Sequence, residues 1–350
     1  MPTTQQNQPI RVAILGAGGL GKGMAEFIPH RPDFQLVAIA DRSGFAFNAA
    51  GLDVQQISQL TQVIEYPGAV ASDEAILELL QAEGENIDAI FKALPNIPVG
   101  FCAQTIEAIV EKTSFRGVIV DALKRTRAVE QLLPLSGQLK EKGILYITGA
   151  GATPGFLTTA AAVAAQSFIE VLSVNIYFGV GISNWEAYKA TIREDLLHLE
   201  GFNAEKVAKM TDAEIQAELD ARDGLLELTQ MEHADDVILE LAGICSRDRV
   251  TVGGLVDTRN AKKPVSTTVT VTGRTLGGAV GSHQFVVSDE TTMVDNVCGP
   301  ALGFMLRGVE LYRQGKYGVI TSADIMPRYQ IQVRQSAASN PLTQKIPTLV

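Results

Sequence analysis

The feature that most constrains this chain is a glycine-rich turn that directly follows an apolar run near the N-terminus. The run Val12 to Leu15 predicts a short buried strand, and it leads into Gly16-Ala17-Gly18-Gly19-Leu20-Gly21, which has the spacing G-x-G-x-x-G. A stretch compatible with a helix, Lys22 to Ile28, comes next. A strand, a glycine turn and a helix in this order are typical of the first unit of a dinucleotide-binding sheet.

The glycines of this turn each have a steric reason. Gly16 permits the tight turn, Gly18 lets a pyrophosphate approach the backbone, and Gly21 allows the helix to pack closely on the strand. The start of the helix offers N–H groups and a partial positive charge to phosphate oxygens. We therefore expect a cofactor to bind at Gly16, Gly18, Gly19, Leu20 and Gly21.

An acidic residue stands where the adenosine ribose is expected. The apolar run Leu36 to Ala40 predicts the next strand and ends in Asp41, 20 positions after Gly21. A carboxylate there accepts hydrogen bonds from both ribose hydroxyls, which favours NAD(H). Arg42 could instead turn toward a 2′-phosphate, so NADP(H) stays possible. The alternative is a glycine-rich turn of another α/β fold, with a solvated Asp41.

The order of the predicted elements indicates the fold class, a doubly wound parallel sheet of Rossmann type followed by an α+β domain of mainly antiparallel strands. Strands are predicted over 87–94, 117–120 and 144–148, and helices over 76–80, 101–110 and 128–142, with Arg42 to Gln59 irregular. Beyond these lie an Ala-rich helix, a charged helical segment over 185–236 and β-branched runs that look like antiparallel strands. We predict a dinucleotide-binding domain over 1–150, a substrate and dimerisation domain over 151–296, a C-terminal helix over 297–328 that returns to the first domain, and a tail over 329–350.

Lys124 is the first candidate for a catalytic role. The strand that ends near Val120 brings Asp121-Ala122-Leu123-Lys124 to the carboxyl edge of the sheet, where ligands bind in such folds. A lysine there could hydrogen-bond a substrate carbonyl or amine, or transfer a proton. The alternative is a solvated basic cluster with Arg125 and Arg127. Asp121 is a weaker candidate, because strand alternation points it to the other side of the sheet.

Two loops at the same edge are candidates for contacts with the ligands. Ala93, Leu94 and Pro95 end a predicted strand and could lie along the nicotinamide half of the cofactor. The loop 149–155 could offer N–H groups to a substrate carboxylate or to the nicotinamide, although a hinge between domains would also need glycine. The predicted substrate-binding residues of this loop are Gly151, Thr153, Pro154 and Gly155.

The remaining polar side chains give weaker signals. The four histidines show no metal-ligand spacing, so no metal is predicted, and His198 and His233 are expected at the surface. Four basic residues of the second domain could clamp a carboxylate, but surface charge is the simpler interpretation for each; they are Lys189, Arg193, Arg259 and Arg274.

The composition disfavours several classes of partner. The formal net charge of −10 disfavours nonspecific binding to nucleic acid or to an anionic membrane. No apolar run reaches the length of about 18 residues that a membrane span needs. Cys102, Cys245 and Cys298 are scattered and suggest no disulfide framework, which fits a reducing cytoplasm.

Four motifs resemble those of the saccharopine dehydrogenase-like oxidoreductases, relatives of homoserine dehydrogenase. They are the glycine turn with Asp41-Arg42, Ala93-Leu94-Pro95-Asn96, Ala122-Leu123-Lys124, and Gly151-x-x-Pro154-Gly155. The resemblance implies a Rossmann domain, a dimerising second domain and NAD(P)-dependent oxidation or reduction of an amino-acid-derived substrate. Leu123 stands where homoserine dehydrogenases have Asn, and the segment 185–236 has no evident counterpart.

The expected function is hydride transfer between a nicotinamide cofactor and a C–N or C–O centre of a small amino-acid-derived carboxylate. The protein is expected to be a homo-oligomer, either a dimer or a tetramer. The alternative is a catalytically silent sensor that binds the dinucleotide and acts through a protein partner on the charged helical segment.

Overall fold

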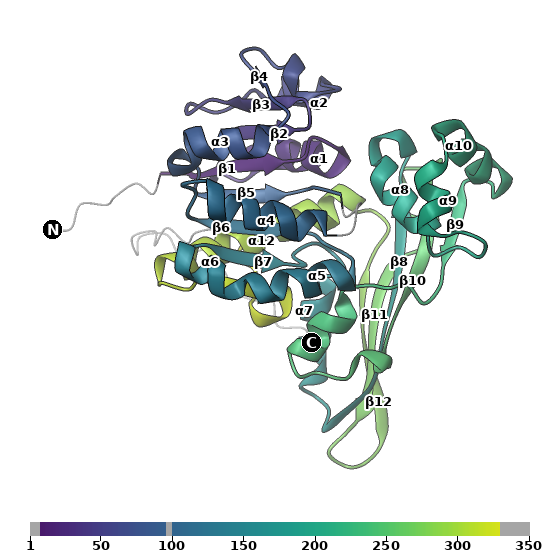
Figure 1. Cartoon of the computed structure of the whole chain (residues 1–350). Coiled ribbons are helices and arrows are strands. Elements are labelled where there is room, and N and C mark those ends of the chain that lie inside the picture. The colour runs from purple at the N-terminus through teal and green to yellow at the C-terminus, as the bar shows by residue number, and fades with distance from the viewer. Residues whose placement is uncertain (1–7, 96–99, 330–350) are drawn as a thin grey trace, which may run out of the picture.

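A computed structural model describes residues 8–95 and 100–329, which form two sheets and the helices around them (Figure 1). The first sheet has the order β13-β7-β6-β5-β1-β2-β3-β4 and the second has the order β12-β11-β8-β10-β9. The strands of the first sheet are β1 (Ile10–Leu15), β2 (Phe34–Asp41), β3 (Gly44–Phe47), β4 (Val70–Ala71), β5 (Ala89–Lys92), β6 (Val118–Asp121), β7 (Leu145–Thr148) and β13 (Gly318–Thr321). Those of the second are β8 (Glu170–Gly181), β9 (Leu225–Leu228), β10 (Val250–Asp257), β11 (Thr267–Arg274) and β12 (Val280–Val287).

Helices join these strands in the order that the sequence predicts for a doubly wound fold, and the predicted fold class is confirmed. They are α1 (Gly19–Phe27), α2 (Val54–Gln59), α3 (Ala75–Glu83), α4 (Phe101–Lys112), α5 (Thr126–Leu132), α6 (Ser136–Lys142), α7 (Phe156–Ala165), α8 (Lys189–Leu196), α9 (Ala204–Lys209), α10 (Asp212–Ala221), α11 (Asp235–Leu241) and α12 (Met293–Arg313).

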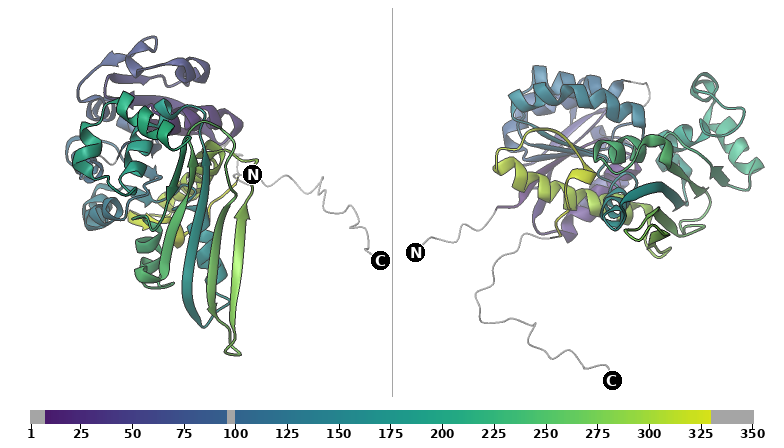
Figure 2. Two further views of the ribbon diagram at one scale, coloured as in Figure 1. Left: turned by 90° about the vertical axis from the view of Figure 1, so that its right-hand side faces the viewer. Right: turned by 90° about the horizontal axis from the view of Figure 1, so that it is seen from below.

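The first sheet is buried on both faces, which explains its continuous apolar runs. Val12 and Ile14 of β1 pack with α1 and α12, whereas Ala13 and Leu15 pack with α3, α4 and α5 on the opposite face. This alternation is the consequence of the two-residue period of a strand. Figure 2 shows the helices as layers on the two sides of the sheet.

Three of the predicted elements differ in the structure, the first of them at a proline that was expected to begin or kink its helix. Pro134 divides the helix expected over 128–142 into α5 and α6, because proline cannot continue the hydrogen-bond ladder. The segment expected to be irregular, Arg42 to Gln59, contains β3 and α2. The charged segment expected to be helical also supplies β9, which pairs with β10.

The second sheet is mixed rather than purely antiparallel. Its long central strand, β8, pairs in parallel with β10 and antiparallel with β11. The connection from β10 to β11 must therefore cross the end of β8. The buried side chains of β11, Val269 and Val271, belong to the same apolar core as Leu157 and Ala161 of α7.

The end of the described chain is part of the first sheet. Helix α12 packs against β6 and β7, and β13 then pairs in parallel with β7. Figure 1 shows α12 behind this sheet, while α8, α9 and α10 stand beside the carboxyl ends of its strands. The domain limits proposed from the sequence stay predictions, and Asn96 and residues 330–350 lie outside the described residues.

Candidate functional site

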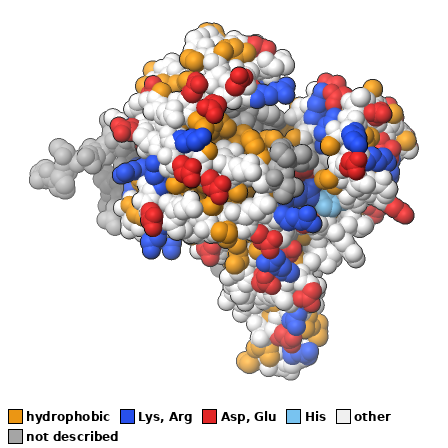
Figure 3. Space-filling view, viewed as in Figure 1, with side chains coloured by type: hydrophobic (Ala, Val, Ile, Leu, Met, Phe, Trp, Pro, Cys, Tyr) orange, Lys and Arg blue, Asp and Glu red, His pale blue; other side chains and the backbone are white. Residues whose placement is uncertain are grey.

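A cavity of about 1010 Å³ lies between the carboxyl edge of the first sheet and the second sheet. Its lining comes from the glycine turn, from the ends of β2, β5 and β6, from α8 and from strands of the second sheet. This volume is at the upper end of the range for ligand sites. On the face shown in Figure 3, acidic and basic side chains are interspersed.

The glycine turn has the geometry that a dinucleotide needs. Gly18 faces open space, since a Cβ built on it would meet no atom within 4 Å. A Cβ on Gly21 would lie 1.8 Å from the carbonyl oxygen of Gly16, so helix and strand are in direct contact there. Gly16 has a φ of +106°, and a Cβ on it would lie 2.5 Å from the carbonyl oxygen of Ala93.

The turn also leaves hydrogen-bond donors for a phosphate. Gly18 is the N-cap of α1 and supplies no side-chain cap, so the first N–H groups of this helix have no intrahelical partner. A pyrophosphate fits at this position, because the space is empty and the helix N-terminus favours an anion. Gly16, Gly18, Gly19 and Leu20 line the cavity, whereas Gly21 packs behind them.

The other predicted cofactor residues lie along the same wall. Asp41, Arg42, Ala93, Leu94 and Pro95 all line the cavity. They come from the ends of β2 and β5, the two neighbours of β1 in the sheet. The crevice at this edge is where open α/β sheets bind their ligands.

Asp41 has structural partners of its own. Its carboxylate accepts hydrogen bonds from the backbone N–H and the hydroxyl of Ser43, at 2.8 and 2.5 Å, and from the N–H of Val63 at 3.0 Å. These bonds hold the tight turn between β2 and β3. A ribose would share this carboxylate with the turn, so the role of Asp41 in cofactor choice stays a prediction.

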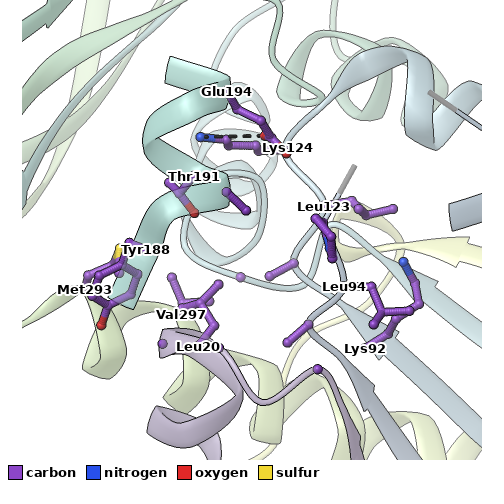
Figure 4. A pocket seen from close by; sticks show the side chains of 18 of the residues that line it. Leu20, Lys92, Leu94, Leu123, Lys124, Tyr188, Thr191, Glu194, Met293 and Val297 are labelled. Carbon is purple, nitrogen blue, oxygen red and sulfur yellow. Dashed lines mark ion pairs between the residues drawn. The ribbon is translucent and has the colours of Figure 1, made fainter. Parts of the chain in front are cut away.

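Lys124 lies in the cavity and pairs with two acidic side chains of α8. Its Nζ is 2.5 Å from Oδ1 of Asp195 and 4.0 Å from Oε2 of Glu194, and the lysine side chain is 21% exposed. Figure 4 shows Lys124 beside Glu194, with Leu123 and Leu94 farther along the wall. The surface-charge alternative for Lys124 is therefore wrong, since its ammonium is held inside the cleft between two carboxylates.

A second basic residue strengthens this junction. Arg125 is buried, and it donates from Nη2 to the carbonyl oxygen of Glu194 at 2.8 Å. Its Nη1 also contacts Nε2 of His198. Burial, together with the Arg125 charge, lowers the pKa of His198 to about 4. A neutral imidazole accepts from Arg125, so His198 is a structural partner of the cleft and is only half-buried.

The prediction that His233 lies at the surface is wrong. His233 is 3% exposed and lines the cavity, and its Nδ1 is 2.7 Å from Oδ2 of Asp235, which is fully buried. The same carboxylate accepts from the hydroxyls of Thr153 and Thr158, at 2.6 and 2.5 Å. A buried carboxylate that orients an imidazole in this way is the usual arrangement of a general acid or base.

The His233 segment is also attached to Lys124. The N–H of Ala234 donates to the carbonyl oxygen of Lys124 at 2.9 Å, so the two candidate residues lie on adjacent backbone. The sequence carries one signal of this pair: His233 precedes Asp235 by two positions, directly before the apolar run of α11. The pairing of a histidine with a nearby acid was visible, but its burial was not.

Asp121 is placed beneath the cavity rather than in it. Its fully buried carboxylate accepts from the N–H groups of Leu123 and Gly149, at 3.1 and 2.9 Å, and from the Tyr146 hydroxyl. Lys92, which lines the cavity, lies 3.9 Å from the same group. Asp121 thus fixes the two loops that present Lys124 and Gly151.

The predicted substrate loop divides into two parts. Gly151 and Thr153 line the cavity. Pro154 and Gly155 do not, because they shape the turn: the Gly151 N–H donates to the Pro154 carbonyl at 3.0 Å, and a Cβ on Gly155 would lie 1.7 Å from the Gly151 carbonyl oxygen. The structure therefore places Pro154 and Gly155 outside the cavity lining, where the predicted contact with a substrate is not made.

The glycine turn is covered by the segment before α8. A Cβ on Gly19 would lie 2.4 Å from the ring of Tyr188, so this ring rests on the turn. Figure 4 shows Tyr188 next to Met293 on the side of the cavity opposite Lys92. Over residues 8–95 and 100–329, no group of three or more His, Cys, Asp or Glu side chains could hold a metal, and no helix could cross a membrane.

Comparisons with known proteins identify a relative over most of the chain. No protein-family model matches. The chain is 41% identical over 351 residues to the (S)-8-amino-7-oxononanoate synthase BioU of Haloferax mediterranei, and the match covers 91% of this chain and 99% of the relative.

Solved structures show the fold. An engineered D-amino acid dehydrogenase bound to NADP+ matches with a TM-score of 0.55 at 17% identity, over 91% of this chain and 95% of that one. The DAP dehydrogenase of C. glutamicum in complex with DAP matches with a TM-score of 0.54 at 17% identity, over 91% and 94%. An amine dehydrogenase from Mycobacterium smegmatis matches with a TM-score of 0.51 at 13% identity, over 93% and 98%.

These findings correct the resemblance inferred from the motifs. The relative that matches across the chain is an 8-amino-7-oxononanoate synthase, and not a saccharopine or homoserine dehydrogenase. The motifs misled because they lie at the glycine turn and at the strand ends, which many Rossmann folds share. The departures from that family at Leu123 and over 185–236 were the better indication that the chain belongs to another family.

Proposed function

The chain belongs to the family of (S)-8-amino-7-oxononanoate synthase BioU, and we propose that it forms or consumes 8-amino-7-oxononanoate with a nicotinamide dinucleotide as cofactor. The observation that carries this proposal is one cavity that joins a glycine turn open to a pyrophosphate with a lysine held between two carboxylates.

The compound named for the relative suits the predicted chemistry. In 8-amino-7-oxononanoate a carbon that bears an amine adjoins a ketone, so the C–N and C–O centres expected from the sequence are neighbours in one molecule. It also carries a carboxylate and an amino group, as an amino-acid-derived compound would. A bound nicotinamide would supply hydride exchange at such a centre.

The residues of the chain have defined tasks in this proposal. Lys124 would donate a hydrogen bond or a proton to the carbonyl oxygen or the amine nitrogen, while Asp195 fixes its ammonium at 2.5 Å. His233, oriented by Asp235, would move the second proton. Gly151 and Thr153 would border the substrate from the opposite loop.

The lining of the second domain fits the rest of such a molecule. A chain of methylene groups needs an apolar wall, and this wall is present. The apolar residues of the lining that come from the second domain and its neighbours include Phe156, Phe178, Val180, Met231, Val256 and Val287.

The identity of the cofactor follows from the end of β2. We propose NAD(H) as the preferred form, because Asp41 lines the cavity and repels a 2′-phosphate. Arg42 also lines the cavity, so NADP(H) is expected to bind more weakly rather than not at all. The homo-oligomer stays a prediction.

The silent sensor has less support. Its partner surface was the charged helical segment, yet Glu194 and Asp195 of α8 turn inward and pair with Lys124. Acidic side chains that face a lysine inside the cavity are not available to a protein partner at the surface.

The proposal is tested with the compound itself. An enzyme must bind its product as well as its substrate, so 8-amino-7-oxononanoate should bind and should react with the oxidised or the reduced cofactor. The measurement combines the absorbance of the reduced nicotinamide with mass spectrometry of the small molecules and of the intact protein. Binding of NADH without binding or conversion of the amino ketone would favour the sensor. If borohydride traps a mass increase on Lys124, the lysine condenses with a carbonyl of the substrate, and this role would replace the proton transfer proposed for it.

A further inference from the structure

A buried lysine at the wall of the cavity has no acidic partner. Lys263 is 5% exposed and lines the cavity from the connection between β10 and β11. Its Nζ donates to the carbonyl oxygen of Ser288 at 2.8 Å and to the hydroxyl of Thr291 at 3.1 Å. No carboxylate in the described part of the chain forms an ion pair with it, although an ammonium has three N–H donors to place.

The position of Lys263 is fixed by two glycines of the central strand. The connection from β10 to β11 crosses the end of β8, and it does so at van der Waals contact. A Cβ on Gly179 would lie 1.7 Å from the carbonyl oxygen of Val265, and a Cβ on Gly181 would lie 2.3 Å from that of Lys262. Gly179 and Gly181 therefore let the connection between β10 and β11 pack directly on β8, and this packing fixes the position of the backbone that carries Lys263.

We propose that Lys263 is the binding group for the terminal carboxylate of the substrate. The two neutral acceptors hold the ammonium in place, and the third N–H is available to an anionic oxygen. This inference rests on the proposed function, and it assigns the two ends of the substrate: the amino ketone at Lys124 and the carboxylate at Lys263, with methylene groups along the apolar wall between them.

The energetics of burial agree with this assignment. Burial lowers the pKa of Lys263, so its ammonium is destabilised in the free protein. The carboxylates of Asp289, Glu290 and Asp295 act in the opposite direction without contacting it. A ligand carboxylate at hydrogen-bond distance would provide the missing partner.

The cations that the sequence offered for this role are occupied elsewhere. Lys189 lines the cavity, but it and Arg193 both pair with Asp212, and Arg274 pairs with Glu170. Arg259 pairs with Asp220. Lys263 was not among the candidates, because nothing in its sequence context distinguishes it from the adjacent Lys262.

The test compares an acid with its ester. Calorimetric titration of the protein with 8-amino-7-oxononanoate and with its methyl ester should show that the acid binds about tenfold to a hundredfold more tightly, the range for a hydrogen bond to a charged group. Lys263→Met should abolish this difference. Lys262→Met is the matched control, since its side chain is 76% exposed and pairs with Asp289, and it should preserve the difference.

Two outcomes would overturn the inference: equal affinity for acid and ester in the unmodified protein, or an unchanged preference for the acid in Lys263→Met. If that variant does not fold, the comparison in the unmodified protein still decides. If 8-amino-7-oxononanoate does not bind at all, the proposed function fails, and nonanoate against methyl nonanoate then tests the lysine independently.

Discussion

The glycine turn permits a prediction in which two similar substitutions have opposite effects. Gly18→Val places a side chain in the open space of the cavity, whereas Gly21→Val places one 1.8 Å from the carbonyl oxygen of Gly16. The first should strongly weaken cofactor binding and leave the fold intact. The second should destabilise the fold.

The expected magnitudes follow from these surroundings. Gly18 has φ −76° and ψ −170°, an extended conformation that valine adopts readily, and no atom lies within 4 Å of its Cβ position. Because Gly18 is the N-cap of α1 and valine is a poorer N-cap than glycine, its substitution should cost about 1 kcal/mol of the free energy of unfolding or less. A valine there excludes the pyrophosphate, and we expect about a hundredfold loss of affinity for NADH, or about 2.8 kcal/mol.

Gly21 has no such freedom. The atom that a Cβ would meet is backbone, so the helix must move away from the strand. Overpacking of this kind costs about 1–3 kcal/mol or more. Gly21→Val should therefore unfold at a lower denaturant concentration than the unmodified protein, before any effect on the cofactor is considered.

Two measurements on the same samples check the pair. Fluorescence titration of NADH gives the dissociation constant, and denaturant unfolding gives the stability. If Gly18→Val binds NADH within about twofold of the unmodified affinity, the pyrophosphate does not bind at this turn. Equal losses of stability in the two variants would show that the space at Gly18 is not open in the folded protein.

The other predictions concern the groups around the cleft. Lys124→Ala should lower turnover about a hundredfold or more with unchanged NADH affinity. Arg127→Ala is the control and should be active, because the Arg127 side chain is 74% exposed. Full activity of Lys124→Ala would contradict a catalytic role for Lys124. Asp41→Asn, which retains an acceptor for the β2–β3 turn, should shift the ratio of the NADPH and NADH dissociation constants toward NADPH; an unmodified protein that already prefers NADPH about tenfold would contradict the role given to Asp41. The pKa of His198 is lowered from 6.5 to about 4, so the folded protein rejects a proton that the unfolded chain accepts, and stability should be complete above pH 6.5 and fall as the pH decreases toward 4. Because water screens this half-buried ring, the loss should be only about 1–2 kcal/mol, and denaturant unfolding of His198→Gln across this range should lack it.

The sequence by itself determined the framework of the first sheet. Apolar runs with a glycine turn at the end of the first run leave few alternatives to a parallel sheet with helices on both faces. The glycine roles could be predicted because they are steric and local: the contact of Gly21 with Gly16 spans five residues, and the open face of Gly18 follows from the same turn.

The predictions failed where burial depends on distant segments. His233 and Lys263 were indistinguishable in the sequence from surface residues, since a charged or polar side chain is ordinarily solvated. Packing decided otherwise: Asp235 and two threonines enclose one of them, and the connection across β8 encloses the other.

The partners of Lys124 show the same division. Its place at a strand end was predictable from the alternation of strands and helices. Its pairing with Asp195, 71 positions later, was not, because a helix from the second half of the chain must first fold over the edge of the first sheet. Local periodicity and sterics fix the strands and the turn, but the electrostatic environment of a side chain exists only after segments far apart in the sequence have packed together.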